Sequence, residues 1–169
     1  MPAKKQYPRR FLRYLLGALL GFVVISIALV LPLRWLQPGT TAFMLQDQSG
    51  RIPVAWQWRD WEALGRQAAL AAIAAEDQKF SQHAGFDVDA ILKSVDAHRD
   101  SGRLRGASTI SQQLAKNLYL WPGRNFLRKG LEAWFTALLE LFLPKRRILE
   151  IYLNVIELHK LFGIVTTLA

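Results

Sequence analysis

The sequence predicts a mostly α-helical protein, with a helical domain behind one N-terminal transmembrane helix. The stretch from Leu15 to Leu33 contains no charged residue, and about 20 apolar residues cross the core of a bilayer as a helix. From Trp61 onward, apolar residues recur at three- and four-residue spacing, as in amphipathic helices. Proline and glycine separate these apolar runs. The chain has 169 residues, which is enough for one domain and accessory segments.

The uncharged stretch has the features of a retained anchor and not those of a cleaved signal peptide. Arg13 and Arg34 bracket it, and Trp35 stands where an interfacial aromatic residue would lie. It is longer than the apolar region of a signal peptide, and no small-residue cleavage site follows it. Basic residues are concentrated in the tail before it, at Lys4, Lys5, Arg9, Arg10 and Arg13. The positive-inside bias therefore places this tail in the cytoplasm and the rest of the chain on the other side of the membrane.

The charge of the chain restricts its partners. Lysine and arginine number 22 against 13 acidic residues, which gives a net charge of +9. A basic domain held beside a membrane points to acidic lipid headgroups or phosphate-bearing substrates. Nucleic acid is the other usual partner of basic proteins, and the expected topology excludes it. The chain has no cysteine, which suits an exported domain without disulfides.

Four segments are expected along the chain. They are a basic cytoplasmic tail at 1–13, a transmembrane helix at 14–35, a membrane-proximal segment at 36–62 and the domain at 63–169. Pro38 and Gly39 predict a turn that leaves the membrane. Any strand is expected only after the transmembrane helix. Residues 42–50 are predicted to form a short extended segment that ends in a loop.

Five helices are expected in the domain. The first starts at Trp61 and has a small-residue face suited to close packing, made of Leu64, Ala68, Ala71, Ala72 and Ala75. The second is capped by Asp87 and ends near 100–102. The third is capped by Ser108 or Thr109 and buries Ile110, Leu114 and Leu118. The last two are expected at 126–143 and 145–156, with Pro144 between them.

Two polar segments in this apolar context carry candidate chemistry. Glu76 ends the alanine-rich helix, and its apolar neighbours suit a general base. The alternative is a solvated charge at a helix end. The second segment is a polar cluster whose alternative interpretation is a solvated helix face: Ser108, Thr109, Ser111, Gln112, Gln113 and Asn117. Gln113, Lys116 and Asn117 fall within one turn, so they can converge on one ligand.

A third set of charges precedes and enters the long helix. Arg128 and Glu132 are four residues apart, and this spacing predicts an ion pair on a helix. In the functional interpretation, Glu132 holds Arg128 or Lys129 in place for a phosphate, or helps to ligate a divalent metal. Arg124 lies just ahead of them.

The three histidines are not expected to bind a metal. The spacings of His83, His98 and His159 are too wide and irregular for a metal site, and cysteine is absent. His83 is expected to be a structural hydrogen-bonding residue, and His98 is expected to be exposed.

Four ordered motifs are recognisable between residues 70 and 157. The first consists of Glu76, Asp77, Phe80, His83 and Gly85. The second consists of Gly106, Ser108, Thr109, Ile110, Gln112, Gln113, Leu114, Lys116 and Asn117. The third consists of Arg128, Lys129 and Glu132, and the fourth of Lys145, Ile148, Leu149, Glu150, Tyr152, Leu153 and Asn154. With these motifs the chain resembles the monofunctional biosynthetic peptidoglycan transglycosylases of glycosyltransferase family 51, whose fold is lysozyme-like.

The resemblance implies an inverting transfer from undecaprenyl-diphosphate-linked lipid II, with a β-1,4-linked glycan and undecaprenyl diphosphate as products. Glu76 is similar to the general base that deprotonates the 4-hydroxyl of the acceptor sugar, and Glu132 to the second essential carboxylate, next to the leaving diphosphate. Other matched residues would steady the diphosphate, namely Lys116, Arg124, Arg128 and Lys129. The remaining ones would line the cleft, namely Ser108, Thr109, Gln112, Gln113 and Asn117.

The resemblance also implies the setting of the protein. The expected partners are lipid II, the growing glycan strand, membrane lipids, and proteins of cell division and cell-wall synthesis, but no nucleic acid. The expected location is the bacterial inner membrane, single-pass, with a cytoplasmic N-terminus and a periplasmic catalytic domain. No metal is firmly implied, and a divalent cation, Mg²⁺ or Mn²⁺, with Glu132 as a ligand, is the candidate cofactor.

The sequence departs from the family pattern after Glu157. Residues 158–169 lack the expected glycines and the fifth motif, so a C-terminally truncated domain is expected. Two alternatives to a lipid II polymerase stay open. One is an inactive membrane-anchored protein of the cell-wall machinery, and the other is a lysozyme-like hydrolase that cleaves glycan.

Overall fold

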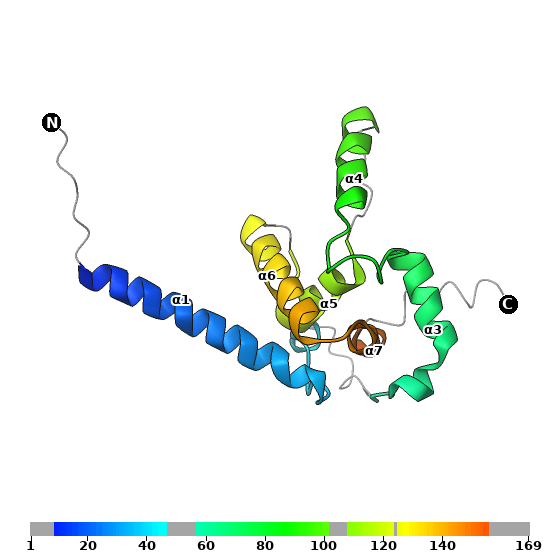
Figure 1. The fold of residues 1–169 in the computed structure, drawn as a ribbon, viewed down its shortest axis with the longest axis horizontal. Coiled ribbons are helices and arrows are strands. Elements are labelled where there is room, and N and C mark those ends of the chain that lie inside the picture. The colour runs from blue at the N-terminus through cyan, green and yellow to red at the C-terminus, as the bar shows by residue number, and fades with distance from the viewer. Residues whose placement is uncertain (1–8, 47–56, 102–107, 124, 156–169) are drawn as a thin grey trace.

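The structure, a computed structural model, describes residues 9–46, 57–101, 108–123 and 125–155, and these contain helices but no strand. Figure 1 shows α1 extending away from the other helices and α4 projecting from them. The helices are α1 (Arg9–Val30), the 3-10 helix η1 (Leu31–Arg34), α2 (Ala42–Leu45), α3 (Trp61–Glu76), α4 (Val88–Ser101), α5 (Ile110–Tyr119), α6 (Phe126–Phe142) and α7 (Lys145–Val155). The predicted mostly α-helical class is confirmed.

Helix α1 and η1 form a continuous apolar segment. Phe11–Arg34 is long and apolar enough to cross a membrane, with a mean hydropathy of 2.7, and only 11% of its most apolar part is buried against the rest of the chain. Such exposure distinguishes it from the core helix of a globular domain, which packs on all sides. As described, α1 includes the basic residues Arg9, Arg10 and Arg13 ahead of the uncharged stretch.

Two arginines attach the end of this segment to the domain. Arg34 donates to the Phe142 carbonyl at 2.7 Å. Arg147 donates to the carbonyls of Leu33 and Leu36, both at 2.8 Å. These contacts join the C-terminal end of the apolar segment to α6 and α7, since Phe142 ends α6 and Arg147 lies in α7.

The residues that follow the apolar segment correct a prediction. The expected extended piece at 42–50 is wrong for Ala42–Leu45, which form α2. Thr41 caps this turn, because its hydroxyl accepts from the Met44 amide at 3.0 Å. Gln46 then donates to the Leu120 carbonyl at 3.3 Å, so a contact distant in sequence holds the segment beside α5. The remainder of the predicted piece lies outside the described residues.

Helix α3 is kinked, and the predicted small-residue face is buried in part. Gly65 has φ 76° and ψ 150°, a conformation outside the helical region that glycine adopts readily. Ala69 and Ala72 are buried, whereas Ala71 and Ala75 are exposed. The predicted face is therefore confirmed in part, since Ala72 is buried and Leu64 and Ala68 pack against the core.

Helix α5 lies at the centre of the domain and packs against α2, α6 and α7. The predicted apolar side is confirmed, since Ile110, Leu114 and Leu118 are buried. Of the two predicted caps, Thr109 is the N-cap: its hydroxyl accepts from the Gln112 amide at 3.2 Å, and the Gln112 side chain accepts from the Thr109 amide at 3.1 Å. The expected cap of α4 is also present, because the Asp87 carboxylate accepts from the Ala90 amide at 2.9 Å.

Substituting Gly85 with Ala is expected to lower the free energy of unfolding by about 2–4 kcal/mol. Gly85 has φ +85°, and an added Cβ would lie 2.7 Å from Cγ2 of Thr136 and 2.9 Å from Cγ of Glu140. Gly130→Ala is the control, because its Cβ would meet nothing within 4 Å and alanine favours a helix interior by up to about 1 kcal/mol. Denaturant unfolding of both variants measures the difference, and equal midpoints would contradict the packing described here.

Candidate active site

Glu76 lies at the C-terminal end of α3 and is exposed. The predicted apolar surroundings are therefore wrong: they were inferred from neighbours in sequence, and Ala74 and Ala75 are exposed beside it. Nε2 of Gln113, on α5, donates to Oε2 of Glu76 at 2.8 Å. The carboxylate is thus open to solvent on one side and held by an amide on the other, as a base that must reach a substrate hydroxyl requires.

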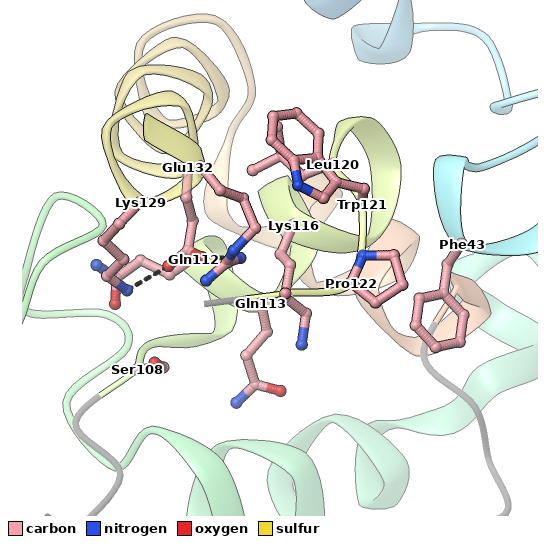
Figure 2. A pocket seen from close by; sticks show the side chains of 12 residues that line it. Phe43, Ser108, Gln112, Gln113, Lys116, Leu120, Trp121, Pro122, Lys129 and Glu132 are labelled. Atoms are coloured by element: carbon pink, nitrogen blue, oxygen red, sulfur yellow. Dashed lines mark hydrogen bonds and ion pairs between the residues drawn. The ribbon is translucent and has the colours of Figure 1, made fainter. Parts of the chain in front are cut away.

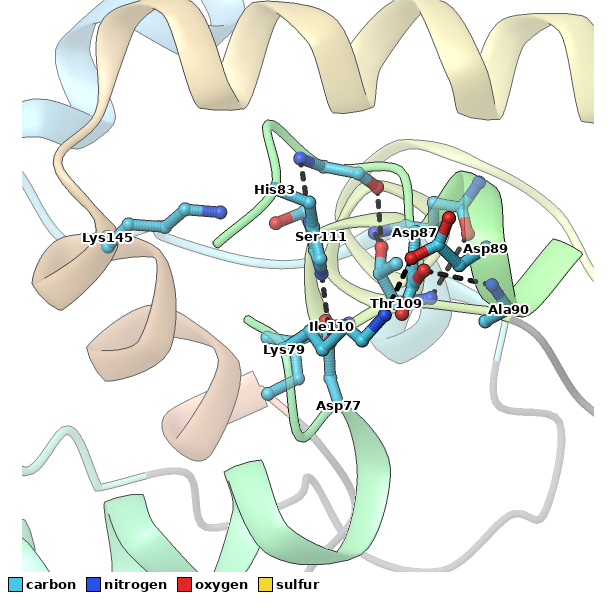
Figure 3. Close-up of polar contacts among 12 residues, drawn as sticks. Asp77, Lys79, His83, Asp87, Asp89, Ala90, Thr109, Ile110, Ser111 and Lys145 are labelled. Carbon is cyan, nitrogen blue, oxygen red and sulfur yellow. Dashed lines mark hydrogen bonds and ion pairs between the residues drawn. The ribbon is translucent and has the colours of Figure 1, made fainter. Parts of the chain in front are cut away.

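Asp77, the next residue, fixes the end of α3 against the rest of the domain (Figure 3). Its buried carboxylate accepts from the Ile110 amide at 3.0 Å and contacts Nε2 of His83 at 2.8 Å. The Gly85 amide donates to Nδ1 of His83 at 3.1 Å, so Nε2 carries the ring proton of the neutral imidazole and donates to Asp77. The expected structural role of His83 is confirmed. The side chain of His98, and His159, lie outside the described residues.

A second, partly buried network joins the first motif to α5, α6 and α7. Glu140 accepts from Ser111 on α5, and from Lys145 at 2.8 Å. The Lys145 ammonium also lies 4.3 Å from the centroid of the Phe80 ring, an interaction between a cation and an aromatic face. The sequence interpretation missed Glu140. The available signal was an acid among leucines near the end of an apolar helix, since a buried carboxylate requires partners.

A cavity of about 470 Å³ lies between α2, α5 and the start of α6 (Figure 2). We call it the cationic cavity, and it is lined by Phe43, Ser108, Gln112, Gln113, Lys116, Leu120, Trp121, Pro122, Gly123, Arg128, Lys129 and Glu132. Three of these residues are cationic and one is a carboxylate, so the lining has a positive surplus. Such a lining favours an anionic ligand.

Glu132 holds two of these cations. It accepts from Nη1 of Arg128 at 2.9 Å through Oε2 and from Nζ of Lys129 through Oε1. Glu132 and Arg128 are both buried, which confirms the ion pair predicted from their spacing. Nε of Arg128 is also buried, and among the described residues it has no hydrogen-bond partner. The guanidinium of Arg128 lines the cavity, where a phosphate would form charge-assisted hydrogen bonds with it.

The other predicted site residues lie in different places. Ser108, Gln112, Gln113 and Lys116 line the cationic cavity. Thr109 and Gln112 cap α5 through their side chains, and the Thr109 hydroxyl also donates to the Gly85 carbonyl at 2.7 Å. Asn117 lines neither of the cavities described here. Arg124 lies outside the described residues. The substrate contacts assigned to these side chains stay predictions.

A second cavity of about 300 Å³ adjoins the first. Its lining includes Glu76, Asp77, Ser108 and Thr109. Ser108 lines both cavities, and Gln113 of the cationic cavity donates to Glu76 of the second. The structure therefore brings an exposed carboxylate next to a space suited to a phosphate, and together these form the candidate active site.

A carboxylate beside a cavity with a positive surplus suits an enzyme that transfers a group from a phosphate-activated donor. A family model described as "Transglycosylase" matches residues 49–167. The chain belongs to this transglycosylase family and is by class a glycosyltransferase. The family predicted from the four motifs is confirmed.

Three relatives illustrate the similarity, and each bears the name "Biosynthetic peptidoglycan transglycosylase". The protein from Chromohalobacter salexigens is 50% identical over 167 residues, covering 95% of this chain and 71% of the relative. That from Ectopseudomonas mendocina is 52% identical over 155 residues, covering 88% and 64%. That from Pseudomonas fluorescens is 48% identical over 155 residues, covering 88% and 65%. The chain thus spans about two thirds of the length of these relatives.

Proposed function

We propose that this chain polymerises the glycan strands of peptidoglycan from lipid II. Glu76 removes the proton from the 4-hydroxyl of the acceptor sugar, and the oxygen attacks the anomeric carbon of the donor. The bond from that carbon to the diphosphate breaks, the diphosphate leaves with the electron pair, and the configuration at carbon inverts. The products are a β-1,4-linked glycan and undecaprenyl diphosphate.

The observation that carries this proposal is the position of Glu76 next to the cationic cavity. A diphosphate is a good leaving group when cations neutralise the charge that develops on it, so a strong general acid is not needed. Lys116, Arg128 and Lys129 line the cavity and supply this positive charge. One base on the other side of the reacting centre then completes the chemistry.

Glu132, the candidate ligand of a divalent cation, already pairs with two basic side chains. Both carboxylate oxygens are engaged, one by Arg128 and the other by Lys129. Among the described residues, no three acidic, histidine or cysteine side chains are grouped as a metal site requires. We therefore propose that the basic side chains, and not a cation held by Glu132, neutralise the diphosphate.

We propose that α1 anchors the protein in the bacterial inner membrane. With α1 across the bacterial inner membrane and the basic tail in the cytoplasm, the catalytic domain lies in the periplasm. Acidic and lipid-linked molecules at the periplasmic surface of the membrane are then the molecules that can bind in the cationic cavity. Protease digestion of intact spheroplasts tests this orientation, because the domain should be cleaved from outside. Complete protection of the domain would contradict it.

Incubation of the full chain in detergent with fluorescently labelled lipid II tests the function. We expect glycan polymers on electrophoresis, at a rate that excess EDTA does not reduce. Absence of polymer would contradict the proposed activity, and a loss in EDTA restored by Mg²⁺ would contradict the cation argument. Purified cell-wall glycan is incubated in parallel, since release of soluble muropeptides from it would favour a lysozyme-like hydrolase instead.

A further inference from the structure

A chain of side-chain hydrogen bonds runs from a buried tyrosine to Glu76 across three helices. The hydroxyl of Tyr152, on α7, donates to Oε1 of Gln113 at 3.2 Å. Nε2 of Gln113, on α5, donates to Oε2 of Glu76 at the end of α3, at 2.8 Å. The amide of Gln113 is thus held at both of its ends.

The direction of these bonds follows from chemistry. An ionised carboxylate can only accept hydrogen bonds, so the Gln113 side chain must present its NH₂ group to Glu76. Its carbonyl oxygen then faces the opposite way and needs a donor. Tyr152 is the residue that meets this oxygen, and its side chain is fully buried and so has little freedom to turn away.

We propose that Tyr152 is a positioning residue for the reaction, because it holds the Gln113 amide in the orientation in which that amide orients Glu76. This inference rests on the proposed function of Glu76 as the base. Without the Tyr152 hydroxyl, the carbonyl oxygen of Gln113 loses its donor and the amide can rotate. Lys116, three residues further along α5, is a cation that lines the same cavity as Gln113. A turn of the Gln113 oxygen toward that cation would take the NH₂ group away from Glu76.

The environment of Tyr152 keeps it available as a donor. Burial, and then the negative charges of Glu76 and Asp77, raise the pKa of the Tyr152 hydroxyl well above its usual value. The hydroxyl therefore stays protonated at neutral pH and can donate to Gln113.

Tyr119 provides a matched control. Its hydroxyl is a second hydrogen-bonded donor in the domain, to the Leu29 carbonyl at 3.3 Å, and burial raises its pKa as well. It lines neither cavity and is not part of the chain of bonds that leads to Glu76. Tyr119→Phe therefore removes a comparable hydroxyl without touching the catalytic carboxylate.

The kinetic test compares Tyr152→Phe with Tyr119→Phe in the full chain with lipid II. We expect Tyr152→Phe to lower kcat about tenfold, the scale of one lost orienting hydrogen bond, with KM within about twofold of wild type. Tyr119→Phe should leave both constants within about twofold. Equal kcat values for the two variants would overturn the proposal.

Gln113→Leu is the second variant, since it removes the donor to Glu76 while leaving Tyr152 in place. It should lower kcat at least as much as Tyr152→Phe, and adding Tyr152→Phe to it should lower kcat no further. Two independent, multiplying losses would show that Tyr152 acts otherwise than through Gln113 and would overturn the proposal.

A readout without turnover separates this inference from the proposed function. In the ¹⁵N NMR spectrum of the full chain in micelles, the Gln113 side-chain amide signals are identified by their loss in Gln113→Leu. We expect Glu76→Gln to shift them, and this shift to shrink when Tyr152→Phe is also present. Gln113 signals that Tyr152→Phe leaves unmoved would overturn the positioning role, whether or not the chain makes polymer. A wild-type chain that makes no polymer but shows the expected shifts would overturn only the proposed function.

Discussion

Glu76→Gln is expected to lower the rate of glycan polymerisation by about 10²- to 10⁴-fold, the range that a general base contributes. The substitution keeps the size of the side chain and its capacity to bond with Gln113, but it removes the group that takes the proton from the acceptor hydroxyl. Glu76 is exposed at the end of α3, so its replacement disturbs no packing. Electrophoresis of labelled glycan and denaturant unfolding of the same preparation measure activity and stability together.

Glu62→Gln is the matched control for this prediction. Glu62 lies on the same helix, is also exposed and pairs with Arg146 at 2.7 Å. An exposed ion pair contributes little to stability, so both the polymerisation rate and the unfolding midpoint should stay close to those of wild type. Polymer produced by Glu76→Gln at the control rate would show that this carboxylate is not the base.

Glu132→Gln is expected to remove activity and to destabilise the fold by about 3–5 kcal/mol, the cost of breaking a buried ion pair on one side. The side chains of Glu132 and Arg128 are only 4% and 10% exposed. Without the carboxylate, the Arg128 guanidinium is left in a buried position without its counter-charge. Both cations that Glu132 holds are then free to leave the geometry that suits a diphosphate. Denaturant unfolding and the polymerisation assay measure the two effects.

Lys129→Met separates the two roles of this cluster. Lys129 is 52% exposed, so its ion pair with Glu132 is largely screened by solvent. Its loss should change the free energy of unfolding by less than about 1 kcal/mol, while the cationic cavity loses one charge. We therefore expect a clear fall in activity from a chain that remains stable. A Glu132→Gln variant as stable and as active as wild type would contradict the arrangement described for both residues.

Local patterns in the sequence were sufficient to predict most of the helices. The caps at Asp87 and Thr109, the apolar side of α5 and the ion pair of Arg128 with Glu132 depend on residues three or four apart, and each is confirmed. The extended piece at 42–45 is wrong, because the Thr41 cap and the contact with Leu120 stabilise a helical turn there.

The parts of the site that escaped prediction depend on contacts distant in sequence. The Asp77 carboxylate accepts a hydrogen bond from the Ile110 amide, and the Glu140 carboxylate accepts from Ser111 and Lys145. The exposure of Glu76 depends on how the kinked α3 meets α7, which the identities of its neighbours along the chain do not reveal. The motifs indicated which residues matter, but only the packing distinguishes those that face a cavity from those that hold the fold.

The attachment of the apolar segment to the domain has a consequence for how a lipid-linked substrate is met. Arg34 and Arg147 form hydrogen bonds between the end of the apolar segment and helices α6 and α7. The domain is therefore fixed to this end of the segment by direct contacts. With α1 in a bilayer, tilting the anchor tilts the cleft with it, and the height of the cleft above the headgroups is set by the protein. A substrate confined to the same plane then needs only to diffuse sideways to arrive at the correct depth. With lipid II as the proposed substrate, the search is two-dimensional, and the bilayer that holds α1 also sets the depth of the diphosphate.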